Sequence, residues 1–358
     1  MARKVRCGPG FATIFRASRA AAWCRHAANR RLRSPVDALS KVLAGIHLQG
    51  AVYLDGEFTA PWCAEASYGL PDARQALDTS EHFAFFHFLV EGSCKARLAD
   101  GDEVVELHAG DLVLFSGDYP HLLGSDLACP AIRTEGLPRD PTASLPVIRY
   151  GGGGAVTRFV CGYLAFDRRV SQPLFNSLPR MLRVPVMDDP NAAWLVELLR
   201  VGVSESRAQR PGASSLLAKL SELIFVEAMR HYTATLAPGQ TGWLAALRDP
   251  HVGKALALLH AEPGRAWTVD DLARESALSR SALGERFAQF IGEPPMRYLT
   301  RWRLGLAAKA LRSGPEAIGR IAERCGYESE AAFNRAFKRE FGVPPAAWRR
   351  NERAASPH

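Results

Sequence analysis

The residues with the clearest chemistry lie near the C-terminus, in the segment IAERCGYESEAAFNRAFKREFGVPPAAWRR, residues 321–350. Phe333 and Phe337 are four residues apart, which places both on one face of a helix. The outward face then carries Glu330, Ala331, Asn334, Arg335 and Lys338. Arginine can donate two hydrogen bonds to guanine, asparagine can pair with adenine, and glutamate can accept from cytosine. Such a face suits the reading of base edges in duplex DNA, and Lys338 suits a phosphate contact.

This segment is the second copy of an internal repeat. The first copy is VDDLARESALSRSALGERFAQFIGEPPMRY, residues 269–298. Leu272-Ala273 corresponds to Ile321-Ala322 at an offset of 49, and the later matches are offset by 50. Those later positions in the first copy are Ser279, Leu283, Phe287, Gly292, Pro294, Pro295 and Tyr298. The extra residue falls in a turn, so each copy predicts a helix, a short turn and a second helix that enters a major groove.

Serine residues stand where the N-caps of the second helices are expected, Ser279 in the first copy and Ser329 in the second. Thr268 is the corresponding cap residue for the short helix that opens the first copy. On the second helix of the first copy, the residues that we expect to face DNA are Arg280, Ser281, Glu285 and Gln289. Both copies together therefore predict two DNA-contacting helices on one chain.

The stretch between the copies, PPMRYLTRWRLGLAAKALRSG, predicts one continuous helix that ends near Ser313. Roughly 17 residues at 1.5 Å each would span ~25 Å. Such a helix would hold the two groove-facing helices in successive major-groove segments, which lie about 34 Å apart on one face of DNA. Arg297, Arg301 and Arg303 on this helix are candidate phosphate contacts.

These motifs resemble the DNA-binding domain of the AraC/XylS family of bacterial transcription regulators. The resemblance covers about residues 249–350, leaves residues 351–358 as a tail, and implies a double helix-turn-helix domain. It also implies base-reading positions at Ser281 and Glu285, and in the second copy at Glu330, Ala331 and Arg335. Because Ser281 and Gly284 are small, we expect DNA shape or phosphate contacts to matter more in the first unit.

Residues 36–170 have the texture of a β domain. Short apolar or alternating runs are punctuated by turn signals such as Asp100-Gly101 and Ala109-Gly110, which is typical of a sandwich or barrel. APWC, FHFLVEG, AGDLVLF and GGGGAVTRFVCGYL resemble the cupin-type sensor domain of one branch of the family. The predicted fold class is therefore α+β multidomain, with an N-terminal cupin-like β-barrel or sandwich, a helical connector at residues 171–240, and a C-terminal all-α domain with two helix-turn-helix units.

Cupins often bind a metal through histidine and carboxylate ligands, for which His82, His87 and His121 are the histidine candidates. Glu91 is better interpreted as a turn residue, because Phe85 falls where the motif would place the metal carboxylate. A carboxylate or thiolate would still be needed to complete three or four ligands. We therefore expect no cofactor, with a metal at these histidines as the minor alternative.

Cysteine chemistry is the other candidate input to the β domain. Cys63, Cys161, His87 and His121 are the effector or redox candidates. A low-pKa, exposed thiol would allow an oxidant switch, whereas a buried structural cysteine is the default interpretation. The helices predicted at residues 191–205 and 214–232 carry apolar residues at helical spacing, which indicates either a packed helix pair or a dimerisation face.

The totals agree with a DNA-binding protein. The chain has 358 residues and a net charge of +8, divided into +9 for residues 1–35, −7 for residues 36–250 and +6 for the remainder. A basic block beside an acidic one favours a polyanionic partner. The acid-free first 35 residues predict a disordered tail, or translation that begins near Val36. Seven scattered cysteines without a C-x-x-C pair fit a reducing cytoplasm. The sequence contains no run of ~18 apolar residues, so it does not predict a membrane span.

The sequence thus predicts a sequence-specific DNA-binding transcriptional regulator without enzymatic activity. We expect a cytoplasmic homodimer on double-stranded DNA that responds to an unknown small molecule or redox signal, with RNA polymerase as a further partner if it activates transcription. The alternative is a metal-dependent cupin oxygenase or isomerase with an accessory helical domain. A third possibility, a structural nucleoid protein, would show weak sequence preference.

Overall fold

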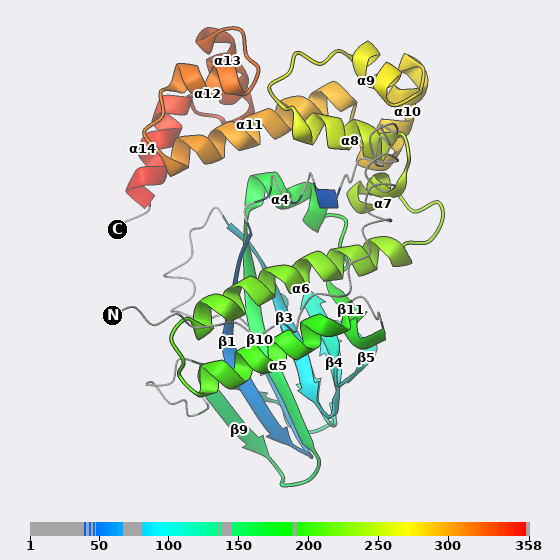
Figure 1. The fold of residues 1–358 in the computed structure, drawn as a ribbon, viewed down its shortest axis with the longest axis vertical. Helices are drawn as coiled ribbons and strands as arrows, with labels where there is room; N and C mark the ends of the chain where they lie inside the picture. The colour runs from blue at the N-terminus through cyan, green and yellow to red at the C-terminus, as the bar shows by residue number, and fades with distance from the viewer. Residues whose placement is uncertain are drawn as a thin grey trace, which may run out of the picture. The chain divides into compact units, whose positions relative to one another are not determined.

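The protein is described by a computed structural model over residues 39–40, 43, 46, 48–66, 81–134, 137, 145–188 and 192–355. The predicted basic tail, the predicted start near Val36 and residues 356–358 lie outside the described residues. In the described chain, strands occupy the first part and helices the second (Figure 1). The predicted fold class, a β-rich N-terminal domain followed by an all-α C-terminal domain, is confirmed.

The strands form two sheets. The larger has the order β11-β6-β3-β10-β1-β9 and the smaller the order β5-β4-β7-β2-β8. The strands are β1 (Leu48–Thr59), β2 (Cys63–Ala66), β3 (Glu81–Glu91), β4 (Ser93–Leu98), β5 (Val104–His108), β6 (Asp111–Phe115), β7 (His121–Gly124), β8 (Ile132–Arg133), β9 (Val147–Gly151), β10 (Val156–Asp167) and β11 (Met181–Pro185). Over the described residues they do not close into one barrel, so the sandwich is the form observed.

Alternation along β3 assigns its residues to two different cores. Phe85 and Leu89 pack in the core between the sheets, together with residues of the smaller sheet such as Leu107. Phe86 and Phe88 point to the other face of the larger sheet and pack in the core that includes the helices. Successive strand residues point to opposite faces, so β3 is buried on both sides and reads as a nearly continuous apolar run.

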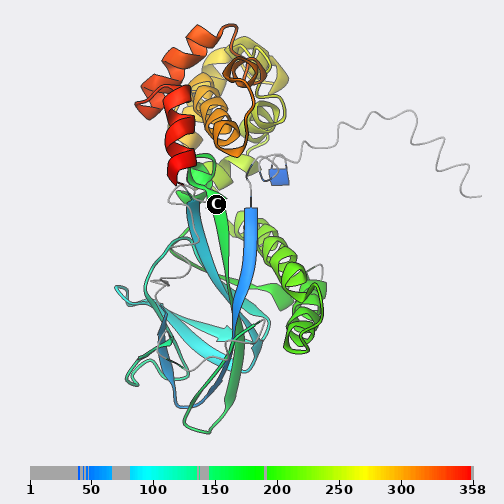
Figure 2. The same cartoon turned by 90° about the vertical axis from the view of Figure 1, so that its left-hand side faces the viewer.

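Two connector helices cover that other face, α5 (Ala193–Arg207) and α6 (Ala213–Thr235), as Figures 1 and 2 show. Gly50 of β1 allows the closest approach, because a Cβ there would lie 2.6 Å from the Cβ of Ser221 in α6. Phe225 of α6 packs against Phe166 of β10 with ring centroids 4.8 Å apart. The predicted apolar face of these helices therefore packs on the sheet. A short helix, α4 (Arg168–Phe175), follows β10.

The C-terminal domain contains α7 (Trp243–Arg248), α8 (Val252–Ala261), α9 (Val269–Glu275), α10 (Arg280–Ile291), α11 (Pro295–Ser313), α12 (Ile318–Arg324), α13 (Glu330–Phe341) and α14 (Pro345–Ala355). Helix α11 is the continuous helix predicted between the repeats, and its 19 residues give a length of ~28 Å. The pairs α9–α10 and α12–α13 are the two helix-turn-helix units.

The two units repeat each other in detail. Helices α10 and α13 each have 12 residues, begin at a serine N-cap and end at a glycine. In the turns, Leu278 N donates to Ala273 O, and at an offset of 49 Tyr327 N donates to Ala322 O. The left-handed residue of this turn is Gly326 in the second unit (φ 76°) but Ala277 in the first (φ 56°). An alanine is strained in that conformation, whereas a glycine is not.

Candidate functional site

The surface of the second unit that is predicted to face DNA is set by the packing of α13. Ser329 Oγ accepts from Ala332 N and fixes where the helix begins. Phe333 and Phe337 are fully buried against α12 and α11, so the helix cannot rotate about its axis. Glu330, Ala331, Arg335 and Lys338 are then exposed, and Asn334 is half-buried. The predicted face of α13 is thus presented to solvent as a single surface.

The first unit presents a different surface. Leu283 and Phe287 are buried, and the exposed residues of α10 include Arg280, Ser281, Glu285 and Gln289. The guanidinium of Arg280 lies 3.7 Å from Asp270, and both side chains are exposed. A Cβ on Gly284 would meet no atom within 4 Å, so this helix face is open at its centre. At the offset of 50, Gly284 corresponds to Asn334, so the first surface lacks a side chain where the second has an amide.

The three linker-helix arginines are engaged with protein groups to different extents. Arg297 lies 3.6 Å and Arg301 2.6 Å from the carboxylate of Glu293. The Arg297 side chain is 80% exposed, so its surface remains accessible to a phosphate. Arg303 differs from the predicted phosphate contact, because its guanidinium donates to Pro263 O and Arg265 O, each at 2.6 Å. Its half-buried position also lowers its pKa.

Arg303 instead stabilises the contact between the two units. The loop that it holds, residues 263–265, lies beside the turn of the second unit, where a Cβ on Gly326 would come within 2.5 Å of Gly264 O. The two units are therefore joined by α11 and by this loop contact. Nothing in the sequence signals this contact, because both partners of Arg303 are backbone carbonyls, which any residue carries.

Three of the four effector or redox candidates meet in the core between the sheets. Cys161 Sγ of β10 lies 2.9 Å from His87 Nδ1 of β3, and His87 Nε2 lies 2.7 Å from His121 Nε2 of β7. His121 Nδ1 lies 2.8 Å from Tyr119 O. All three side chains are at most 2% exposed. Burial lowers the pKa of His121 to about 4 and, with the neighbouring His121, that of His87 well below its usual value.

The remaining candidates lie elsewhere. His82 is five residues before His87, so it points to the opposite face of β3, where its Nε2 lies 2.9 Å from Ser116 O. The three histidines considered for a metal are thus not brought together. The described residues contain no group of three or more histidine, cysteine or acidic side chains arranged to hold a metal ion. Cys63 is buried in β2, and burial, followed by the nearby Cys129, raises its pKa.

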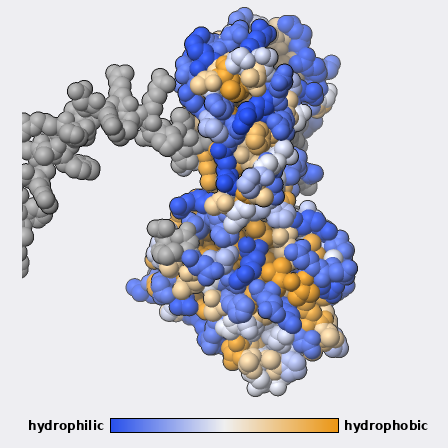
Figure 3. Space-filling view, turned by 90° about the vertical axis from the view of Figure 1, so that its right-hand side faces the viewer, coloured by the Kyte–Doolittle hydropathy of each residue, from blue (hydrophilic) through white to orange (hydrophobic). Residues whose placement is uncertain are grey.

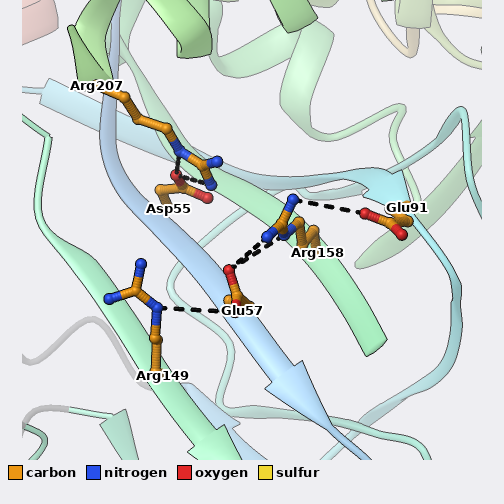
Figure 4. Close-up of polar contacts among 6 residues, drawn as sticks. All are labelled: Asp55, Glu57, Glu91, Arg149, Arg158 and Arg207. Carbon is orange, nitrogen blue, oxygen red and sulfur yellow. Dashed lines mark hydrogen bonds and ion pairs between the residues drawn. The ribbon is translucent and has the colours of Figure 1, made fainter. Parts of the chain in front are cut away.

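A charged network lies on the helix-facing side of the larger sheet (Figure 4). It comprises Asp55, Glu57, Glu91, Arg149, Arg158 and Arg207. Arg158 donates to Glu57, 2.7 Å away, and this hydrogen bond lowers the pKa of Glu57. Arg207, at the end of α5, is ion-paired with the buried Asp55 of β1. The Arg207–Asp55 pair thus connects α5 to β1. Asp55 directly follows Leu54, which is the register partner of Cys161 on β10.

No helix in the described part of the chain is long and apolar enough to cross a membrane. The face drawn in Figure 3 carries hydrophilic residues over most of its area, and its hydrophobic residues gather in patches, the larger of them in the lower half of the view.

Two helix-turn-helix units that follow a cupin-like β domain in the chain define a class of transcription regulators. Residues 37–234 match the family described as Cupin, and residues 272–351 match the family described as Helix-turn-helix domain. An AraC-like transcription regulator of Streptomyces lividans is 36% identical over 74% of this chain and 86% of its own length. Another AraC-like transcription regulator, from Streptomyces antibioticus, is 33% identical over 88% of this chain and 97% of its own length. The chain belongs to this family of AraC-like transcription regulators.

Among solved structures, the DNA-binding domain of AdpA in complex with a target DNA is similar to this chain. It is 28% identical, with a TM-score of 0.29, and the match covers 30% of this chain and 96% of that one. The two family matches and the two Streptomyces relatives confirm the predicted family and the predicted function, a DNA-binding transcription regulator with a cupin-like domain.

Proposed function

We propose that the protein binds one class of duplex DNA site by reading bases mainly with α13 and positioning itself with α10 and α11. The observation that carries this proposal is the contrast between the two exposed faces. On α13, Arg335 and Asn334 offer two-donor or donor-acceptor chemistry for base edges. On α10, the position that corresponds to Asn334 is Gly284, and the guanidinium of Arg280 lies 3.7 Å from Asp270. Arg297, Arg301 and Lys338 are assigned to phosphates, which fix register without reading sequence.

The proposal separates two variants by their effect on specificity. Arg335→Ala should cost ~1–3 kcal/mol on the preferred site and relax preference at one base position. Lys338→Ala should weaken binding on all sequences alike and reduce the slope of log affinity against log salt by about one. Binding isotherms on selected and random duplexes at several salt concentrations measure both effects. Equal losses for both variants on both duplexes would contradict this division of roles.

Dimerisation through the connector helices is a further part of the proposal. Of the nine large hydrophobic residues that are exposed in the described chain, five lie on α5 and α6, which are Trp194, Leu198, Val201, Leu216 and Leu223. On α5 they recur at helical spacing and form one stripe. Burying such a stripe against the same stripe of a second copy would remove it from water and give a two-fold symmetric dimer.

Charge placed on this stripe tests the dimer. Leu198→Glu should convert the dimer to a monomer, measured by sedimentation equilibrium, and should weaken binding to paired half-sites. Val104→Glu is the matched control, because Val104 is a similarly exposed apolar residue (47% against 41%) on β5. Unchanged mass for both variants would contradict the assignment of the interface.

The β domain receives the signal in this proposal, and the buried Cys161–His87–His121 cluster is the proposed receiving site for a small-molecule or redox effector. A ligand changes DNA occupancy only as far as its affinities for the DNA-binding and non-binding states of the protein differ. Cys161→Ser should abolish the effector response, whereas Cys63→Ser should leave it intact. The reverse pattern would move the site to Cys63. In the same proposal, the protein acts in the cytoplasm and without catalytic turnover, and RNA polymerase is a partner where binding raises transcription.

A further inference from the structure

The hydrogen-bond pattern of the buried cluster fixes where each proton resides. Tyr119 O can only accept, so His121 Nδ1 carries a proton and donates it to that carbonyl. A neutral His121 then has a bare Nε2, which accepts from His87 Nε2–H. His87 Nδ1 is bare in turn and accepts from the thiol of Cys161. Burial favours the neutral form of both imidazoles, which agrees with their lowered pKa values.

This order of groups is that of a nucleophile, a base and a group that orients the base. Cys161 supplies the sulfur and His87 the acceptor nitrogen beside it, while His121 holds the His87 ring in the tautomer that can accept. Similar arrangements activate nucleophiles on unrelated folds, and they are recognised by geometry rather than by sequence position. The three residues come from β10, β3 and β7, so both sheets contribute to the cluster.

We propose that this cluster lets the buried Cys161 thiol add to a small, uncharged α,β-unsaturated carbonyl compound, which is the effector class of the receiving site. The sulfur forms a bond to the β-carbon of the reagent while its proton moves to His87 Nδ1. That proton is then delivered to the α-carbon, so the product is the neutral thioether and His87 returns to its starting form. The elements S–H add across one C=C bond, and no oxidant, reductant or leaving group is required.

The surroundings select the reagent. Phe115 and Phe159 contact His87 edge-on, with ring centroids 5.9 Å from it, and Phe115 stacks on His121 at 3.7 Å. An ion would lose its hydration in this aromatic core, which excludes charged reagents. Hydrogen peroxide would lose its hydrogen bonds to water among these aromatic rings, so the lining favours an organic carbonyl compound. Reaction requires a transient opening of the sandwich, because the cluster is enclosed in the folded state.

An adduct on Cys161 would also disturb its neighbours. The core is close-packed, so added atoms must displace side chains or strands. Leu54 is the register partner of Cys161, and the next residue, Asp55, is the ion-pair partner of Arg207 at the end of α5. The adduct is thus one residue from the contact that connects the sheet to a helix of the proposed dimer face. This consequence rests on the proposed function, whereas the addition itself does not.

The chain supplies its own controls for the chemistry. Cys94 and Cys325 are also buried, and burial raises their pKa values to about 12 and about 11, respectively. The full-length protein is treated with methyl vinyl ketone, and the modification rate of each cysteine is measured by peptide mapping. Cys161 should react on the order of 100-fold faster than Cys94 and Cys325, the size of effect that a positioned general base supplies. Equal rates for the three thiols would mean reaction through general unfolding and would overturn the proposal.

Variants of the histidines separate chemistry from packing. His87→Gln should lower the Cys161 rate to that of Cys94 and leave the Cys94 rate unchanged. His121→Gln keeps a side-chain oxygen that can accept from His87 and should retain most of the rate, whereas His121→Phe should lose it. Loss in both His121 variants, with unchanged Cys94 rates, would contradict the orienting role. Faster reaction of Cys161 with hydrogen peroxide than with methyl vinyl ketone at equal concentration would overturn the reagent class.

DNA binding by the modified protein tests the consequence separately. A Cys161 adduct that forms at the expected rate and changes the affinity for the preferred duplex supports both the chemistry and the sensing role. An adduct that forms and leaves the affinity and the dimer unchanged supports the chemistry and refutes sensing by this site. An absent adduct in a protein that binds DNA specifically refutes the chemistry alone.

Discussion

Acidification should destabilise the DNA-binding domain through one buried histidine, His260 of α8. Its Nε2 lies 2.7 Å from the hydroxyl of Tyr298, within hydrogen-bond distance, and Trp243 Nε1 donates to the same hydroxyl at 2.8 Å. Tyr298 is in α11 and Trp243 in α7, so this group connects three helices of the C-terminal domain. Burial lowers the pKa of His260 to about 3, so it stays neutral in the folded protein at every pH used for binding.

The magnitude follows from proton linkage. An unfolded histidine has a pKa of about 6.5, so below that pH the unfolded chain binds a proton that the folded chain does not. Stability is therefore greatest above pH ~6.5 and falls as the pH decreases toward the folded pKa. The slope approaches ~1.4 kcal/mol per pH unit, which gives ~2 kcal/mol between about pH 7.5 and about pH 5 for this single group.

Replacement of His260 by glutamine isolates this contribution. The amide of the introduced glutamine can donate to or accept from the Tyr298 hydroxyl and does not titrate. His87 and His121 remain in both proteins, so their contributions cancel in the comparison. Urea denaturation followed by tryptophan fluorescence gives the free energy of unfolding at both pH values and constant salt. The wild type should lose ~2 kcal/mol more than His260→Gln on acidification. An identical loss for the two proteins would refute the argument that His260 is neutral when folded.

Two further predictions concern strain and buried charge. Ala277→Gly should raise the free energy of unfolding by up to about 1 kcal/mol, because it relieves a left-handed alanine, whereas Gly326→Ala should lower it by more than that. Thermal or urea unfolding measures both, and destabilisation by Ala277→Gly would contradict the strain argument. Arg207→Ala should cost roughly 1–3 kcal/mol, discounted because Arg207 is 37% exposed, since it leaves Asp55 buried without its cation. Arg149→Ala removes a mostly exposed partner of Glu57 and should change stability little. Equal losses for Arg207→Ala and Arg149→Ala would contradict the argument that burial of Asp55 makes its ion pair matter more.

The helical half of the fold was predictable because its signals are local. Serine caps, glycine ends and i, i+4 apolar pairs each concern a few neighbouring residues, and the internal repeat contains each of these three signals twice. The turn residue shows the limit of that information. Gly326 indicates a left-handed residue in the turn, but its counterpart Ala277 does not. Only the internal repeat indicates that the two turns are equivalent, and both have the same hydrogen bond.

The sensor cluster was predictable as a set of residue types but not as a site. His87 and His121 are 34 residues apart, and His87 and Cys161 are 74 residues apart, so strand pairing alone decides whether they meet. The alternation of β3 does separate His82 from His87 without any tertiary information, since their spacing is odd. Arg303 could not be assigned from its residue type. The sequence predicts that its charge contacts a phosphate, whereas its guanidinium donates to two backbone carbonyls of the same chain.

We propose that both helix-turn-helix units of one chain enter adjacent major-groove segments of one duplex, and that α13 reads most of the bases. Methylation-interference footprinting on a duplex selected by the full-length protein tests this most directly. We predict two groups of interfering guanines per protomer, centred about one helical turn (~10 base pairs) apart, of which one is lost for Arg335→Ala. A single group, or interference spread evenly along the duplex with no preference over random DNA, would contradict the account.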